Sequence, residues 1–417
     1  MKITDLKSYL IEYDWFDPHT KDPSTAMKQN IHNRSDVYIK VSNEPDTIKR
    51  ELLFVQINTD EGITGWGEIT NYPGDVGNRA MQKYVAEIKP FLLGRDPTKI
   101  EEIWSRTFRL FTYTGTRGAT TAAMSGIDIA LWDIFGKSVN LPIYKLLGGS
   151  VRNEVPLYTH PPNPDDDIEL AVENAKEIVK SGHKAFKMDP MMHFSLSGYN
   201  SGNVGFLDGE ISAEGAYKAE QVTAEIRSAV GPDIEILIDA HGKFNVPTAI
   251  NLANRLEPYG IHWFEEPVPV ESYHALEQVK DSTNVRISVG ERLHTRFEFI
   301  PIFENNLADY VMPDVTWTGG ITELKKISTM AEAYYIPVSP HDASGPINII
   351  AGAHVSMTVP NFYKLETIRY DLSGYDTLID KPLDVREGNL YMPDAPGLGI
   401  NLDEEFLKNH VVDGYGP

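Results

Sequence analysis

The sequence contains no cysteine among its 417 residues. Disulfide bonds, thiolate nucleophiles and sulfur-ligated zinc or iron centres are therefore excluded. Any metal ion that the protein binds must be held by oxygen or imidazole ligands.

Long apolar runs are also missing. No stretch reaches the ~18 apolar residues of a membrane-spanning helix. The first residues, MKITDLKSYLIEYDWFD, carry acidic side chains where a signal peptide would be continuously apolar. The sequence therefore predicts a cytoplasmic protein.

Basic residues are few relative to acidic ones. The chain has 38 Lys and Arg against 60 Asp and Glu, a formal net charge of −22 at pH 7. Such a charge repels nucleic acids and anionic membranes, so neither is an expected partner. Solubility alone could explain the surplus. An acidic protein that handles an anionic substrate must create positive potential locally, and a bound divalent cation would supply it.

The length and the pattern of the chain predict two structural units. Hydrophobic residues make up 41% of the sequence, and 417 residues exceed what one compact core usually holds. Residues 1–124 mix extended runs, such as 51–58, with helical ones, such as 80–91, and indicate an α+β domain. Residues 125–380 predict a barrel domain, and residues 381–417 are expected to return to the first domain.

Repeated βα units are predicted across the barrel domain. Short β-branched runs alternate there with amphipathic stretches, which is typical of a parallel sheet with covering helices. Eight such units close into a barrel with its catalytic groups on the loops that follow the strands. The eight runs are 155–159, 185–188, 234–238, 262–264, 286–289, 310–312, 336–339 and 362–365.

Every predicted strand is followed by a polar or ionisable residue. A single acid after a strand is more often a helix cap than a functional group. Eight strands in succession with such residues favour a functional rim. In chain order the residues are His160, Lys187 with Asp189, Asp239 with His241, Glu265 with Glu266, Glu291, Asp314, His341 and Glu366.

Three of these acids have even spacing. Asp239, Glu265 and Glu291 are 26 residues apart, about one βα unit, so they should converge from consecutive strands. Unneutralised carboxylates would repel one another in a partly desolvated cleft. Mg²⁺ suits such a site, and Mn²⁺ could replace it. The alternative for each acid alone is a cap or a salt bridge.

Two histidines are candidates for proton transfer. His241 lies two residues after Asp239 and, if the strand geometry persists, points the same way as that ligand. Asp314 and His341 end the sixth and seventh strands, close enough for the carboxylate to orient the imidazole as a general base. A hydrogen-bonded structural role is the alternative for a lone histidine. The other candidates, expected on loops that contact substrate, are His160, His294, His19 and His32.

Several motifs together resemble a known family. They are SGIDIALWDIFGKSVNLPIYKLLGG at residues 125–149, and the DAHG, FEEP, GER, PD…GGITE and PHDASGPI segments. Over nearly the whole chain they resemble the mandelate racemase subgroup of the enolase superfamily. Within it, the Asp-x-His pair and the GERLHTRFEF and PHDASGPI stretches are most similar to D-galactonate dehydratase and related sugar-acid dehydratases.

The resemblance implies a fold and a metal-dependent reaction. The fold would be a (β/α)7β-type TIM barrel with an N-terminal α+β capping domain that the C-terminal segment completes. Mg²⁺ would be bound by Asp239, Glu265 and Glu291, and would stabilise the charge that forms on the substrate. The substrate would be a small sugar acid, an aldonate, which loses its C2 proton and its 3-hydroxyl to give a 2-keto-3-deoxy acid. A homo-oligomer is also expected.

The resemblance also implies roles for individual side chains. His341, oriented by Asp314, would take the C2 proton, and His241 would protonate the departing hydroxyl. Glu366 would bind the carboxylate end of the substrate, and Lys187 would stabilise the carboxylate or the enediolate.

One position departs from the racemase pattern. Racemases of the group have a second lysine two residues after the first, where this chain has Asp189. This argues against two-base racemisation and favours elimination with one base and one acid. A turn-forming role before Pro190 is an equal alternative for Asp189.

Further substrate contacts are expected from two segments, residues 13–34 and 189–208, although the second could be a surface insertion. The candidate substrate-binding residues are Tyr13, Trp15, His32, Arg34, His160 and Asp189. An epimerase, a lactone cycloisomerase and a non-catalytic ligand-binding relative remain as alternatives.

Overall fold

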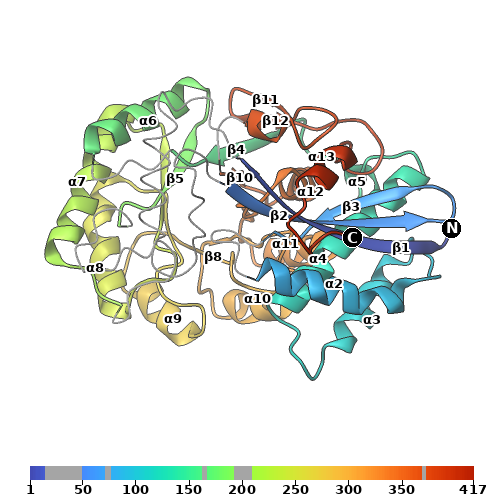
Figure 1. Ribbon diagram of the computed structural model, residues 1–417. Helices are drawn as coiled ribbons and strands as arrows, with labels where there is room; N and C mark the ends of the chain where they lie inside the picture. The colour runs from blue at the N-terminus through green and yellow to red at the C-terminus, as the bar shows by residue number, and fades with distance from the viewer. Residues whose placement is uncertain (15–48, 71–76, 162–166, 192–208, 369–371) are drawn as a thin grey trace.

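The computed structural model describes residues 1–14, 49–70, 77–161, 167–191, 209–368 and 372–417. Figure 1 shows two parts side by side: a small sheet with its helices near both chain ends, and a ring of strands surrounded by helices. Among the described residues, no helix is both long and apolar enough to cross a membrane.

The N-terminal part contains an antiparallel sheet of three described strands, β1 (Ile3–Asp14), β2 (Lys49–Thr59) and β3 (Thr64–Glu68). The helices α2 (Asn78–Leu92) and α3 (Ile100–Leu110) follow it in the chain. The predicted extended run 51–58 lies within β2, and the predicted helical run 80–91 lies within α2. The α+β character predicted from the sequence is confirmed.

Helix α4 (Ala119–Ser138) joins this sheet to the barrel. It packs on β3 at very short range, because a side chain at Gly67 would come within 1.8 Å of the Gly126 carbonyl oxygen. It also contacts α11 (Gly320–Ala333) of the barrel. The domain boundary predicted at residues 124–125 lies within α4, and the predicted domain limits stay a prediction.

The barrel is built from parallel strands in chain order. β4 pairs with β5, and parallel pairing continues through β9. Isolated parallel bridges then join Val311 to Val338 and Val338 to Phe362, and β10 pairs with β4. The pairing thus returns to its first strand, as in a (β/α)7β-type TIM barrel. The strands are β4 (Val155–Thr159), β5 (Ala185–Met188), β6 (Glu235–Asp239), β7 (Trp263–Glu265), β8 (Ile287–Val289), β9 (Tyr310–Val311) and β10 (Leu365–Thr367).

Seven of the eight predicted runs coincide or overlap with these strands. The exception is 336–339, which forms only the single bridges at Val338. Pro337 and Pro340 flank that residue, and proline has no N–H to donate to a ladder. A regular strand is therefore not formed there, although the segment occupies the seventh position of the ring.

Helices cover the outside of the ring, with α6 to α9 along one side (Figure 1). Four of them begin at side chains that accept a hydrogen bond from the first turn: Asp167, Ser212, Asn245 and Ser272. Besides α2, α3, α4 and α11, the helices described up to residue 375 are α5 (Ile143–Leu146), α6 (Ile168–Lys180), α7 (Ala213–Val230), α8 (Val246–Leu256), η1 (Glu257–Tyr259), α9 (Tyr273–Asp281), α10 (Thr295–Glu304), α12 (Pro346–Ser356) and η2 (Leu372–Tyr375).

The C-terminal segment contacts both parts of the molecule. The hairpin β11 (Asp384–Arg386) and β12 (Asn389–Tyr391) pairs with the start of β4. After α13 (Glu404–Asn409), Val411 forms an antiparallel bridge with Ile11 of β1. The predicted return of the chain to the first domain is confirmed, but the hairpin first extends the barrel sheet.

Candidate active site

Three acids predicted to bind a metal ion lie together at the carboxyl ends of consecutive strands. Asp239 ends β6 and Glu265 ends β7, and the two are direct partners in the parallel register. Glu291 lies two residues after the end of β8. One carboxylate oxygen from each residue lies within 4.8 Å of the others, and all three side chains are buried. The convergence predicted from the 26-residue spacing is therefore present.

The backbone turns sharply just after each of these strands. His241 and Glu266 have φ angles of 52° and 41°, in the left-handed region that residues other than glycine rarely adopt. Gly290 has φ 137°, and a side chain there would come within 2.8 Å of the Met312 nitrogen. Strained backbone conformations of this kind are concentrated at functional sites. Here the sharp turns keep the three carboxylates at the rim of the barrel.

Lys187 lies at the centre of the carboxylate cluster. Its Nζ is 3.0 Å from Asp239 Oδ2, 2.7 Å from Glu265 Oε1 and 2.7 Å from Glu366 Oε1. Burial lowers the pKa of Lys187, but the three carboxylates outweigh it and hold the pKa well above its usual range. The lysine therefore stays charged.

Two fixed cations lie beside the three carboxylates of the triad. Besides Lys187, Arg292 approaches Glu291, with 3.1 Å between Nη2 and Oε1. Burial and the Asp239 carboxylate raise the pKa of Glu265 well above its usual range. Asp239 Oδ2 is buried and, despite the nearby Lys187, lacks a donor in hydrogen-bonding geometry. Oxygen ligands with unsatisfied negative charge fit a hard divalent cation such as Mg²⁺.

His341 and Asp314 form the predicted pair. A parallel bridge joins their backbones at neighbouring positions of the ring, and His341 Nδ1 lies 2.7 Å from Asp314 Oδ2. The other oxygen of Asp314 accepts hydrogen bonds from the backbone and hydroxyl of Thr316. His341 Nε2 is 3.3 Å from Glu291 Oε2, so this ring nitrogen faces the triad. A proton on Nδ1 leaves Nε2 available as a base.

The local field controls the protonation of His341. Burial lowers its pKa, but Glu366, Asp314 and Glu291 outweigh burial and raise the pKa to about 9. A divalent cation held by Asp239, Glu265 and Glu291 would add positive charge close to this imidazole and lower its pKa toward neutrality.

His241 is also hydrogen-bonded to a carboxylate. Its Nδ1 is 2.9 Å from Asp189 Oδ2, and its Nε2 is 3.5 Å from Asp239 Oδ2. The strand does not continue to His241, contrary to the geometry assumed from the sequence, because the backbone there is left-handed. The imidazole still lies beside the first ligand.

Asp189 has the predicted turn-forming contact and, in addition, a contact with His241 that the sequence did not predict; its role in substrate binding stays a prediction. Its Oδ1 accepts a hydrogen bond from the Met191 nitrogen, which is typical of a turn. Its Oδ2 binds His241 and the buried ammonium of Lys243. Burial raises the pKa of Asp189, but Lys243 and His241 outweigh it, so the pKa lies below its usual range. The ionised carboxylate orients the imidazole.

Glu366 and His160 complete the described cluster. His160 Nε2 lies 2.6 Å from Glu366 Oε1, the same oxygen that Lys187 contacts. Burial raises the pKa of Glu366, but Lys187 and His341 hold it well below its usual range. His294, another candidate, instead lies 3.6 Å from Glu298 at the start of α10. The side chain of Tyr13, and the residues Trp15, His19, His32 and Arg34, lie outside the described residues, as does most of the 189–208 segment.

Several site residues have no distinctive sequence signal. Lys243 follows His241 by two positions and could be noticed only as part of the same loop. Arg292 directly follows Glu291. Glu266 appears in the sequence only as a second strand-end acid, yet its buried carboxylate accepts a hydrogen bond from the Gly290 nitrogen. Burial raises the pKa of Glu266 to about 7, although Arg292 opposes the shift.

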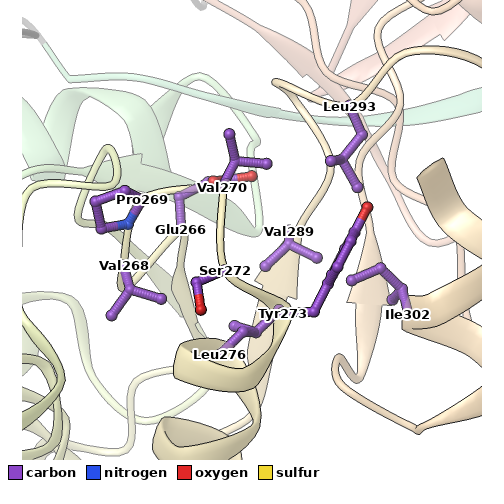
Figure 2. Close-up of a pocket in the computed structure, with 10 residues that line it drawn as sticks. All are labelled: Glu266, Val268, Pro269, Val270, Ser272, Tyr273, Leu276, Val289, Leu293 and Ile302. Atoms are coloured by element: carbon purple, nitrogen blue, oxygen red, sulfur yellow. The ribbon is translucent and has the colours of Figure 1, made fainter.

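Glu266 also borders a small apolar pocket that is separate from the triad. Figure 2 shows this pocket between the loop before α9, α9 itself and the second half of α10, with Val268, Leu276 and Ile302 among its lining residues. Glu266 is the one charged residue of the ten that line it. The pocket contains none of the predicted metal or proton-transfer residues.

Comparisons with known proteins agree with this geometry. The family described as enolase C-terminal domain-like matches residues 170–406, and the mandelate racemase / muconate lactonizing enzyme N-terminal domain matches residues 37–148. The chain belongs to the enolase superfamily. The resemblance inferred from the sequence motifs is confirmed, and both parts of this superfamily member have their own family match.

Named relatives cover most of this superfamily member. A D-xylonate dehydratase of Haloferax volcanii is 32% identical over 368 residues, covering 87% of this chain and 86% of that protein. A D-galactonate dehydratase of Ralstonia pickettii is 34% identical over 362 residues, covering 85% and 90%. The crystal structure of an enolase superfamily member from Salmonella Typhimurium aligns with a TM-score of 0.82 at 31% identity, covering 98% and 97%.

Proposed function

We propose that the protein is a Mg²⁺-dependent sugar-acid dehydratase that converts an aldonate to a 2-keto-3-deoxy acid. The observation that carries this proposal is the pair of histidines on either side of the triad, each bound through Nδ1 to its own carboxylate. One base and one acid beside a cation site suit elimination from a β-hydroxy acid. The dehydratase relatives support the substrate class.

The cation would be held by Asp239, Glu265 and Glu291. When bound, Mg²⁺ supplies a Lewis acid for the negative charge that develops on the substrate carboxylate. Lys187 adds a fixed positive charge at the same place, because its Nζ contacts two of the three acids. Glu366, which shares a hydrogen bond with His160, lies at the carboxylate end of the substrate; the Lys187 ammonium supplies the charge there, and Glu366 would donate a hydrogen bond to the substrate carboxylate only in its protonated form.

Proton removal is assigned to His341. Asp314 fixes the proton on Nδ1, so Nε2 is the atom that accepts the C2 proton. Asp314 then stabilises the imidazolium that forms, and two hydrogen bonds from Thr316 keep that carboxylate in place.

Loss of the hydroxyl is assigned to His241. Its Nδ1 is engaged by Asp189, so the acidic proton is delivered from Nε2 to the departing 3-hydroxyl. The resulting enol tautomerises to the 2-keto-3-deoxy product. Lys243 balances the charge of Asp189 and prevents that carboxylate from acting as a second base.

A substrate screen tests this function. Purified protein with Mg²⁺ is incubated with a library of aldonic and aldaric acids, and 2-keto-3-deoxy products are detected with semicarbazide. We expect at least one aldonate to react and every reaction to stop after chelation. A library without any dehydration product, in which a ligand still binds or isomerises, would contradict the proposal.

A further inference from the structure

Glu68, the last residue of β3, extends from the N-terminal sheet into the barrel. Its side chain is fully buried. Oε1 accepts hydrogen bonds from the Gly345 nitrogen at 2.6 Å and the Thr70 hydroxyl at 2.9 Å. Oε2 accepts from the Ile347 nitrogen at 3.2 Å and the Asn348 nitrogen at 3.1 Å. Four donors therefore hold one carboxylate between the two parts of the molecule.

These contacts make Glu68 the cap of helix α12. The helix begins after Gly345, which has no side chain to cap it. The carboxylate satisfies free N–H groups of the first turn and lies at the positive end of the helix dipole. A side chain at position 345 would come within 2.5 Å of Glu68 Oε1, so glycine at this position lets the Glu68 carboxylate approach the helix end. The cap comes from another domain.

The capped turn is connected to the base. Asn348, whose backbone nitrogen binds Glu68, donates from its side chain to both oxygens of Asp314, at 3.3 and 3.2 Å. Asp314 in turn holds His341. The loop that carries His341 runs directly into α12, so its far end is also fixed by Glu68.

A second connection comes from the next part of the same segment. The Thr70 carbonyl accepts hydrogen bonds from Trp317 Nε1 at 2.9 Å and the Ser344 hydroxyl at 3.1 Å. The Trp317 ring lies 5.1 Å from the His341 ring, between centroids. Glu68 and Thr70 thus tie together the two loops that carry Asp314 and His341.

A purely structural cap would need none of these connections. Asp128 of α4 provides the comparison, because it is a buried carboxylate that accepts from the backbone and hydroxyl of Thr322 in α11. Burial raises the pKa of both Glu68 and Asp128 to about 7, opposed by their hydrogen bonds. The two acids differ in that, among the described contacts, only Glu68 is linked to Asp314, through Asn348.

We propose that Glu68 is a positioning residue through which the N-terminal domain fixes the His341–Asp314 pair for proton abstraction. Glu68 contacts neither the triad nor the substrate end of the site; it acts through Asn348, Asp314 and the loop before α12. The proposal rests on the proposed function, in which His341 is the general base. It makes the N-terminal domain part of the proton-transfer machinery.

The test compares Glu68→Gln with Asp128→Asn in the full chain. Glutamine retains the size but turns an N–H₂ group toward backbone N–H donors, so the loop shifts. A displacement on the ångström scale costs roughly 100-fold in rate. We expect Glu68→Gln to lower kcat by about 10- to 100-fold with KM and Mg²⁺ affinity nearly unchanged. Asp128→Asn should lower the melting temperature and leave kcat within about twofold.

A double-mutant cycle tests the route. Asn348→Ala removes the amide that binds Asp314 but keeps the backbone nitrogen that binds Glu68. If Glu68 acts through Asn348, the double variant should have a kcat no more than about threefold below the worse single variant. Multiplied losses, an unchanged kcat in Glu68→Gln, or a rise in KM alone would overturn the proposal.

A readout without turnover separates this proposal from the proposed function. The rate at which diethyl pyrocarbonate modifies His341 can be measured by peptide mass spectrometry in the metal-loaded protein. We expect Glu68→Gln to raise this rate by about threefold or more and Asp128→Asn to leave it unchanged. Equal rates in all three proteins would overturn the proposal. Inactivity of the wild-type protein in the aldonate screen, with the rates still differing, would contradict only the proposed function.

Discussion

At the residue scale, the site depends on charges that are balanced in pairs. His341 is hydrogen-bonded to Asp314 and His241 to Asp189, and Lys187 lies among three acids. The two histidines therefore have different surroundings. Among the described contacts of Asp314 and Asp189, only Asp189 is also bound by a buried lysine, Lys243. Different environments are how one side-chain type serves as acid and as base at a single pH.

Replacement of the proposed base, His341, should stop the reaction at its first step. We expect His341→Asn to lower kcat by roughly 10²- to 10⁴-fold, the usual contribution of general acid–base catalysis. Exchange of the C2 hydrogen with solvent, followed by NMR, should be lost to the same degree. Mg²⁺ binding, measured by calorimetry, should persist. Retention of C2 exchange in this variant would show that another group is the base.

Replacement of the proposed acid, His241, should separate the two proton transfers. We expect His241→Asn to lose dehydration by roughly 10²-fold or more and to retain exchange at C2, because His341 is intact. Asp189→Asn should show the same pattern with a smaller loss, since it removes only the orientation of His241. The ratio of C2 exchange to product formation measures this separation. Equal loss of both activities would argue against the assigned roles.

Much of the residue-scale picture follows from spacing. Asp239, Glu265 and Glu291 could be predicted because equivalent positions on parallel strands must converge. Lys243 and Glu68 could not. Lys243 is one basic residue of a polar loop, and Glu68 is distant in sequence from Gly345 and Asn348. Their roles depend on how the two domains pack, and no local pattern encodes that packing.

At the element scale, strands were predictable where β-branched runs are uninterrupted, and less so where proline or a left-handed residue intervenes. The run 234–238, which contains three isoleucines, overlaps β6, whereas 336–339 forms only bridges because of Pro337 and Pro340. His241 leaves the strand path, yet reaches the predicted neighbourhood by a turn. The position at which a strand ends therefore predicts the location of the site better than an extrapolation of the strand past that position.

The junction between β3 and α12 makes an element-scale prediction. In Gly345→Ala, the new methyl group would displace the Glu68 carboxylate, so we expect a loss of about 1–3 kcal/mol in the free energy of unfolding. Denaturant titration measures this loss, and kcat should fall as in Glu68→Gln. Gly352→Ala in the same helix meets only the flexible side chain of Leu365, at 3.2 Å, and serves as the control. Equal effects of the two substitutions would contradict the prediction.

At the scale of the whole molecule, a net charge of −22 surrounds a cluster of buried acids. This charge opposes the approach of an anionic substrate, and the proposed cation would reverse the potential locally. The fold class and the two-part organisation were predictable from the pattern of the elements. The way in which residues 384–391 extend the barrel sheet before the tail rejoins β1 was not, because such pairing is set by long-range packing.

Metal binding should stabilise the whole molecule. A ligand at 100 times its dissociation constant stabilises the native state by about 2.7 kcal/mol. We expect Mg²⁺ to raise the melting temperature by a few degrees in scanning calorimetry and chelation to reverse the rise. Glu265→Gln should abolish the shift, whereas Glu214→Gln on the surface of α7 should not. A shift that persists in Glu265→Gln would place the cation elsewhere.

The most direct test of the account follows one reacting aldonate in D₂O by NMR. Abstraction of the C2 proton and loss of the 3-hydroxyl predict a product with a ketone at C2 and one deuterium at C3, where the enol takes up a solvent proton. A product that keeps its 3-hydroxyl and carries deuterium at C2 would contradict dehydration and identify the protein as an epimerase.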